Sequence, residues 1–182
     1  MGFYLESSQS ASKSAKPKIS SKQIGELGEQ FVAHWLSLQG WQILFHQYHC
    51  RWGEIDLVTV SSWLHSGEMK AQAPTHNNIL SFVEVKTRSR GNWDADGLLA
   101  ITPTKQGKLI QSAQLFLSQF PQFAELPCRF DVALVRCEPW GNAELNVESL
   151  YNFPPGIEIK QPITIPGYQL TLQQYLESAF GS

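Results

Sequence analysis

The stretch Phe82-Val83-Glu84-Val85-Lys86-Thr87-Arg88 decides the fold that this sequence predicts. Its apolar and β-branched residues indicate a strand inside a sheet. Glu84 and Lys86 are two positions apart, and residues i and i+2 of a strand point to the same face. A carboxylate and an ammonium group therefore project together from an apolar run. Because buried charges are costly unless they are paired or bind a metal, this pair is the first candidate for a functional site.

The length and composition predict one domain with a substantial core. The chain has 182 residues, of which 42% are hydrophobic, including six Trp and ten Phe. It contains no run of about 18 apolar residues that would span a membrane, and the N-terminus lacks the apolar segment of a signal peptide. Three cysteines without CxxC spacing support neither a disulfide framework nor a zinc site. We therefore expect a cytoplasmic protein that does not associate with membranes.

The charge is distributed unevenly along the chain. The net charge is −2, which differs from the strongly basic balance of a tight duplex-DNA binder. Residues 13–110 carry 11 Lys or Arg against 8 Asp or Glu, whereas residues 138–182 carry one Lys against five Glu. A modest basic surface around Lys86 favours a weak, salt-sensitive interaction with nucleic acid.

The hydrophobic pattern predicts the order helix, strand, strand, strand, helix, strand. Helices are expected over residues 20–39, ending at Gly40, and from Thr102-Pro103 to about residue 120. The expected strands cover residues 41–50, 54–60, 82–88 and 128–136. A last strand with a short helix is expected over 145–153, and a short helix over 171–180. This order predicts an α/β architecture in which helices flank a mixed β-sheet.

The chain is expected to divide into three regions. Residues 1–19 are rich in Ser and Lys and predict a disordered basic tail. Residues 20–153 form the predicted domain, with residues 61–78 inserted as a long loop. Residues 154–182 begin with Pro-Pro-Gly and are expected to be a C-terminal extension.

Acidic residues in two other predicted elements can approach Glu84. Asp56 lies in the alternating strand 54–60, where Glu54 and Val58 are expected on its face and Ile55 on the other. If this strand pairs with the next one, Asp56 and Glu84 converge at one end of the sheet. Glu29 lies at the edge of the apolar face of the first helix, so it is either a fourth member or an ordinary surface acid.

Such a cluster of oxygen ligands predicts a divalent metal ion. Two close carboxylates repel each other, and both ionise readily only with a cation between them. Hard oxygen ligands favour Mg²⁺ or Mn²⁺ over Zn²⁺, and the carbonyl of Val85 can supply a further ligand. Lys86 would then lie beside an attacking water. The alternative is a plain Glu84–Lys86 ion pair, because the pattern Glu-x-Lys alone occurs in many strands.

Five segments of the sequence form a set of motifs: Gly25 to Glu29, Arg51 to Leu57, Phe82 to Arg88, Lys105 to Leu117 and Arg129 to Val132. Together they resemble the YraN family of predicted endonucleases. This family is assigned to the PD-(D/E)xK, restriction-endonuclease-like superfamily and is similar to archaeal Holliday-junction resolvases. The resemblance covers roughly residues 21–153, with Ile55 in place of the motif proline. It implies a restriction-endonuclease-like core.

The resemblance also implies roles for Glu29, Asp56, Glu84 and Lys86, and the residues themselves suggest Val85 and the DNA contacts. Asp56, Glu84 and Lys86 are expected to be catalytic, and Glu29, Asp56, Glu84 and Val85 to bind the metal. The residues expected to contact the DNA backbone are Arg51, Thr87, Arg88, Lys105 and Lys108.

The implied function is that of a Mg²⁺- or Mn²⁺-dependent endonuclease that hydrolyses phosphodiester bonds, with branched or damaged DNA as the candidate substrate. Two alternatives stay open. One is a catalytically idle nuclease fold that binds DNA junctions or a repair partner, and the other is an enzyme that acts on RNA. Because related resolvases act as dimers on two-fold substrates, a homodimer is also compatible with the resemblance.

Overall fold

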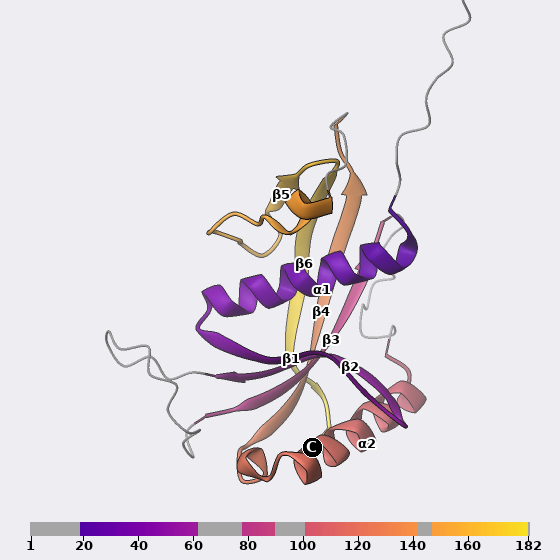
Figure 1. The fold of residues 1–182 in the computed structure, drawn as a ribbon, viewed down its shortest axis with the longest axis vertical. Helices are drawn as coiled ribbons and strands as arrows, with labels where there is room; N and C mark the ends of the chain where they lie inside the picture. Colours follow the sequence, from indigo (N-terminus) through magenta and orange to yellow (C-terminus); the bar gives the residue numbers. More distant parts are fainter. Residues whose placement is uncertain (1–18, 62–77, 90–100, 142–146, 182) are drawn as a thin grey trace, which may run out of the picture.

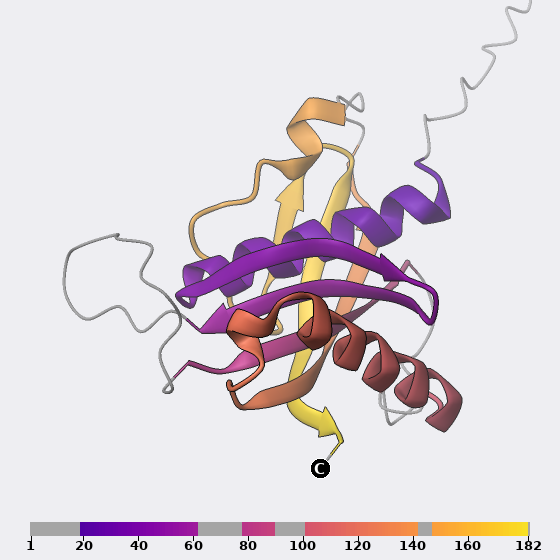
Figure 2. The same ribbon diagram turned by 60° about the horizontal axis from the view of Figure 1, so that its bottom comes forward.

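A six-stranded mixed sheet with one helix on each face forms the core of the protein (Figures 1 and 2). The computed structural model describes residues 19–61, 78–89, 101–141 and 147–181. The helices are α1 (Ser21–Leu38) and α2 (Pro103–Gln119), with short 3-10 helices η2 (Pro121–Phe123) and η3 (Val147–Tyr151). The strands are β1 (Trp41–Cys50), β2 (Gly53–Ser61), β3 (Leu80–Arg88), β4 (Cys128–Pro139), β5 (Pro162–Ile165) and β6 (Tyr168–Phe180). The predicted mixed sheet flanked by helices is confirmed.

The strand order places β3 in the interior of the sheet. The order is β1-β2-β3-β4-β6-β5. β3 runs antiparallel to β2 and parallel to β4, and the chain crosses from β3 to β4 through α2. The pairing of β2 with β3 fulfils the condition under which Asp56 and Glu84 were expected to converge.

Both helices begin at the residues that the sequence indicates. Ser20 forms a capping box, in which its hydroxyl accepts a hydrogen bond from the Gln23 N–H while the Gln23 side chain accepts one from the Ser20 N–H. Thr102 caps α2 by accepting from the Lys105 N–H, and Pro103 occupies the first turn. α1 is followed by Gly40, whose φ of 84° suits glycine after a helix end.

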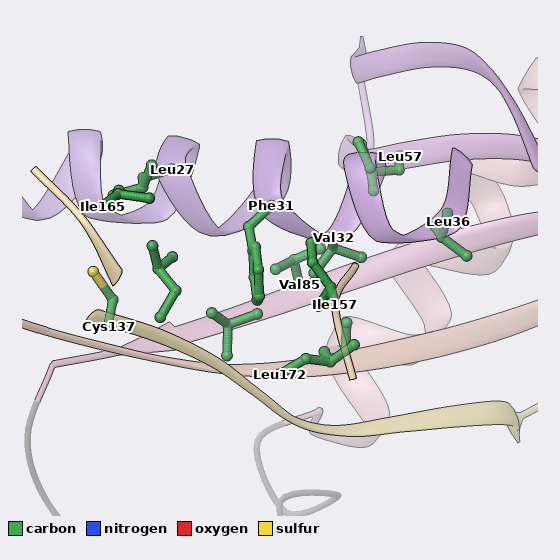
Figure 3. Packing of buried hydrophobic residues seen from close by; sticks show 14 of the residues in the cluster. Leu27, Phe31, Val32, Leu36, Leu57, Val85, Cys137, Ile157, Ile165 and Leu172 are labelled. Atoms are coloured by element: carbon green, nitrogen blue, oxygen red, sulfur yellow. The ribbon is translucent and has the colours of Figure 1, made fainter. Parts of the chain in front are cut away.

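Each face of the sheet packs against its own helix. On the α1 face, Figure 3 shows Leu27, Phe31, Val32 and Leu36 of α1 directed toward the sheet. On the α2 face, the Phe116 ring lies between 5 and 6 Å from the rings of several aromatic residues of the sheet; these are Phe45, Tyr48 and Phe82. Because both faces are covered, β3 is buried over most of its length.

The helix predicted over residues 171–180 is wrong, since these residues belong to strand β6. β6 pairs with β4 on one side and with β5 on the other. Tyr168, Leu170 and Leu172 alternate with period two and are buried on the α1 face. The backbone of β4 needs a second partner, and pairing with β6 supplies it. Within the expected C-terminal extension, residues 162–165 and 168–180 therefore belong to the same sheet.

Several other predictions fall at the borders of the described residues. The tail and the inserted loop lie outside the described residues except at their ends. Ile19, the last residue of the expected tail, donates its N–H to the Tyr168 hydroxyl at 3.2 Å. Of residues 145–153, which were expected to form a strand and a short helix, Val147–Tyr151 form the 3-10 helix η3. Neither α1 nor α2 is long and apolar enough to span a membrane, within the described ranges.

Candidate functional site

The site begins where β2 and β3 stop pairing. Their backbone ladder extends to the pair Leu57 and Val83. One step further, the Asp56 carboxylate accepts a hydrogen bond from the Val85 N–H at 2.6 Å. The side chain of Asp56 thus takes over the role that a backbone carbonyl of β2 would have in a continued ladder. This contact holds the carboxylate, which is only 6% exposed, against β3.

Glu84 brings a second buried carboxylate to the same position. It is 2% exposed, and its Oε1 atom forms ion pairs with Lys86 and with Lys105, whose Nζ lies 3.2 Å away. Its Oε2 atom is buried without a hydrogen-bond partner among the described residues. One oxygen of Glu84 is therefore bound by two ammonium groups, while the other is buried and unsatisfied within the described residues.

Burial and the nearby charge of Glu84 change the protonation of Asp56. Burial, and next the charge of Glu84, raise the pKa of Asp56 to about 7. Glu29 adds a smaller effect in the same direction, whereas the Val85 N–H and Lys86 favour the ionised form. A cation between the carboxylates would relieve this repulsion.

Glu29 lies close enough to the acids to interact with them through its charge. Gln47 of β1 donates a hydrogen bond from Nε2 to Glu29 Oε2 at 2.9 Å. Burial raises the pKa of Glu29, and the charges of Glu54, Glu26 and Glu84 add to that effect. Glu29 is thus partly buried and near the other acids, while Glu26 forms an ion pair with the exposed Lys22.

The predicted alternation of β2 is interrupted at Asp56. Ile55 was expected on the face opposite Val58, but both pack in the cluster on the α2 face, whereas Leu57 packs on the α1 face. The partner strand shows a matching irregularity, because Gln47 has a left-handed φ of 52°. The interruption lets Asp56 reach laterally to β3.

Thr87, which was expected to contact DNA, has its side-chain oxygen buried beneath α1. Its Oγ1 is buried and has no hydrogen-bond partner in the described part of the chain. A Cβ atom built on Gly28 of α1 would lie only 1.9 Å from this oxygen, so α1 passes directly over Thr87. Since side chains alternate along β3, Thr87 points to the α1 face, away from Glu84 and Lys86.

The other predicted DNA contacts lie at or near the surface. Arg51, Arg88 and Lys108 are exposed, and the guanidinium carbon of Arg51 lies 5.0 Å from the centre of the Trp52 ring. Lys105 has a role that the sequence did not indicate, namely its ion pair with Glu84. The position of Lys105 at the edge of the apolar face of α2 is the sequence feature that could have indicated this contact with a buried acid.

Asp131 has a structural role in the centre of the sheet. It is fully buried and accepts from Arg129 Nε at 3.0 Å, Ser81 Oγ at 2.6 Å and Tyr175 OH at 2.8 Å. The N–H of Ser178 donates to its other oxygen at 2.9 Å. These contacts join β3, β4 and β6.

The oxygen atoms at the fork, which is the place beside Asp56 and Glu84 where β2 and β3 separate, fit a hard divalent cation. Asp56 supplies one carboxylate, and Glu84 supplies the buried Oε2 atom that lacks a partner. The N–H and C=O groups of one strand residue point to the same side, so the Val85 carbonyl also faces Asp56. No three His, Cys, Asp or Glu side chains of the described residues converge tightly enough to hold a metal by themselves. The Val85 carbonyl and water would therefore have to complete the coordination, with Glu29 further out.

The fold and the site define a mixed α/β protein with paired acids and two lysines at a fork between strands. Residues 28–135 match the family described as "Uncharacterised protein family UPF0102", and the chain belongs to this family. A UPF0102 protein of Acaryochloris marina is 49% identical over 160 residues, which cover 87% of this chain and 90% of the relative. A UPF0102 protein of Trichodesmium erythraeum is 45% identical over 181 residues, covering 94% and 97%. One of Synechocystis is 43% identical over 159 residues, covering 87% and 97%.

Proposed function

We propose that the protein is a Mg²⁺- or Mn²⁺-dependent DNA endonuclease of the PD-(D/E)xK superfamily. The observation that carries this proposal is the buried Glu84 Oε2, which has no partner within the described residues, in a side chain whose charge acts on the buried carboxylate of Asp56. A buried carboxylate oxygen without a partner is costly. A divalent cation would satisfy it and would also remove the repulsion from Glu84, which adds to the effect of burial on the pKa of Asp56.

Each group of the site has a role in this reaction. Asp56, Glu84 and the Val85 carbonyl would hold the cation, which when bound supplies positive charge for phosphodiester hydrolysis. Lys86 positions the attacking water. Hydrolysis transfers the hydroxyl of that water to phosphorus, breaks one phosphorus–oxygen bond and delivers a proton to the leaving oxygen. Lys105 can move from Glu84 to a substrate phosphate once the cation neutralises Glu84.

The test is cleavage of a panel of branched, nicked, single-stranded and duplex DNAs with Mg²⁺ or Mn²⁺. We expect Lys86→Ala and Asp56→Ala to lower cleavage by at least about 100-fold while the fold remains intact. Lys22→Ala is the matched control, because Lys22 is an exposed lysine of α1. Cleavage by the two site variants at the wild-type rate would contradict the proposal.

One observation favours the alternative of a catalytically idle DNA-binding fold. Two ammonium groups already compensate the charge of Glu84. Calorimetric titration with Mg²⁺ and Mn²⁺ separates the two functions. Binding that disappears in Glu84→Gln supports the endonuclease, whereas no binding at millimolar concentrations supports the idle fold.

A further inference from the structure

A hollow lies beside the site formed by Asp56, Glu84, Lys86 and Lys105. It is located between the β1–β2 turn and the N-terminal half of α2. Its volume is about 410 Å³, and the residues that line it are His49, Cys50, Trp52, Gly53, Glu54, Lys105 and Lys108. Lys105 belongs to both places, because its Nζ lies 3.2 Å from Glu84 Oε1. A molecule bound in the hollow would therefore lie next to Glu84.

The wall formed by the turn carries an exposed aromatic ring. Trp52 is 38% exposed, and the Arg51 guanidinium lies over its ring at 5.0 Å. This cation–π contact fixes the ring and adds a positive charge beside it. The remaining surface of the indole is available for stacking.

The turn is anchored, so the hollow is formed before any ligand binds. Cys50 Sγ donates a hydrogen bond to Ser112 Oγ of α2 at 3.2 Å, and Cys50 pairs with Gly53 across the turn. Gly53 has a φ of 141°, which side-chain-bearing residues rarely adopt. These constraints hold Trp52 at a fixed position relative to α2.

The wall formed by α2 carries positive charge. Lys105 and Lys108 both line the hollow, and Lys108 is exposed. Both lie in the first turns of α2, where the partial positive charge of the helix N-terminus adds to theirs. The hollow thus combines an aromatic platform with cations, and proteins that bind single-stranded nucleic acid use this combination.

We propose that this hollow binds an unpaired DNA nucleotide, with its base stacked on Trp52 and its phosphates at Lys105 and Lys108. This inference rests on the proposed function, since it places the unpaired nucleotide next to the cleavage site. A base within a continuous duplex is already stacked and cannot reach the indole. The site therefore favours DNA with a single-stranded segment, such as a fork or a flap, over intact duplex.

The test measures binding in EDTA, so that no cleavage interferes. The probes are a single-stranded oligonucleotide that carries one 2-aminopurine and the same oligonucleotide in a perfect duplex. We expect Trp52→Ala to weaken binding of the single strand by about tenfold or more and to leave duplex binding within about twofold. Quenching of the 2-aminopurine by stacking should disappear with the indole, and Trp52→Phe should restore most of the affinity.

Two further variants serve as controls. Trp140→Ala removes another exposed indole, 53% exposed, which is absent from the described residues lining the hollow. Trp140→Ala should change neither the affinity for the single strand nor the affinity for the duplex. Lys108→Ala should weaken both probes by a similar factor, because phosphate contacts are insensitive to pairing.

Single-strand affinity that survives in Trp52→Ala would overturn the inference, as would an equal loss for both probes or the absence of binding by the wild-type protein. The outcome is independent of the cleavage panel. Trp52-dependent binding by a protein that cleaves nothing would refute the endonuclease and leave the nucleotide site in place. If the protein cleaves DNA but Trp52→Ala leaves its preference for single-stranded over duplex DNA unchanged, the nucleotide site alone would be refuted.

Discussion

The Val85 N–H donates to the Asp56 carboxylate across 2.6 Å, at the point where β2 and β3 separate. A side chain thereby replaces a backbone carbonyl in the sheet ladder. This replacement keeps an acid buried next to Glu84 without leaving the backbone of β3 unsatisfied.

The first prediction concerns the pH dependence of stability without divalent cations. The pKa of Asp56 is raised from 3.8 to about 7 in the folded protein. The folded state therefore binds this proton more tightly than the unfolded state. The binding of this proton adds to the free energy of unfolding. Its contribution is fully present below about pH 4 and is lost as the pH rises to about 7. Asp56→Asn, which keeps an acceptor for the Val85 N–H, should lose this dependence.

Urea unfolding in EDTA between pH 4 and pH 8 measures the effect. The free energy of unfolding of the variant should exceed that of the wild type at pH 8, by at most about 4 kcal/mol, and the difference should shrink toward pH 4. A difference that is constant with pH would show that Asp56 titrates normally.

The second prediction concerns the two lysines that share Glu84. Lys86→Met and Lys105→Met each leave one ammonium group on the buried carboxylate, so each should destabilise the protein only modestly. The double variant leaves the charge without a partner. Its cost should exceed the sum of the single costs by about 1 kcal/mol or more. A double-mutant cycle of unfolding free energies measures the coupling, and strictly additive values would mean that the lysines do not share Glu84.

The third prediction tests the close contact of α1 with β3. A Cβ on Gly28 would meet Thr87 Oγ1 at 1.9 Å and Thr87 Cβ at 3.0 Å. Rotation of Thr87 offers little relief, because its Cγ2 lies at 3.1 Å. Gly28→Ala should lower the free energy of unfolding by about 1–3 kcal/mol.

Gly25→Ala in the same helix is the matched control for this clash. A Cβ on Gly25 meets nothing within 4 Å, so this substitution should be neutral or stabilise by up to about 1 kcal/mol. Combining Gly28→Ala with Thr87→Ala should recover part of the loss, because Oγ1 and Cγ2 are removed while the Cβ at 3.0 Å remains. If Gly28→Ala and Gly25→Ala had the same free energy of unfolding in urea, α1 would have to lie further from β3 than the structure shows.

The fourth prediction concerns the buried carboxylate of Asp131. Asp131→Ala removes an acceptor used by Arg129, Ser81, Tyr175 and the Ser178 N–H, and it leaves Arg129 next to an empty position. We expect a loss of about 3–5 kcal/mol, because a buried ion pair is broken.

Limited proteolysis should also show earlier cleavage within β6, since Tyr175 and Ser178 belong to this strand. Glu177→Ala is the control. Glu177 pairs with Arg129 at 2.9 Å but its side chain is 63% exposed, so its loss should cost less than about 1 kcal/mol. Equal costs for the two variants would contradict the role of Asp131.

Features with a local physical cause could be predicted from the sequence. The capping box at Ser20 and the Thr102-Pro103 start of α2 depend on neighbouring residues alone. The shared face of Glu84 and Lys86 follows from the period of a strand, and their ion pair is present. These signals were sufficient to place both helices and the interior strand.

Features that depend on tertiary contacts could not be predicted in the same way. The segment 171–180 has the composition of a helix, and pairing with β4 makes it a strand. The direction of Asp56 depends on an irregularity that β2 shares with β1 around Gln47. The burial of Thr87 depends on Gly28, which lies in another element.

The position of β6 between β4 and β5 has a consequence for synthesis on the ribosome. β4 is complete at Pro139, but the strand that covers its second edge begins only at Tyr168. During translation this edge is exposed until about 30 to 40 more residues have left the exit tunnel, and exposed strand edges promote association between chains. We therefore expect nascent chains that lack 168–180 to need chaperones, even though all residues of the fork have already been made.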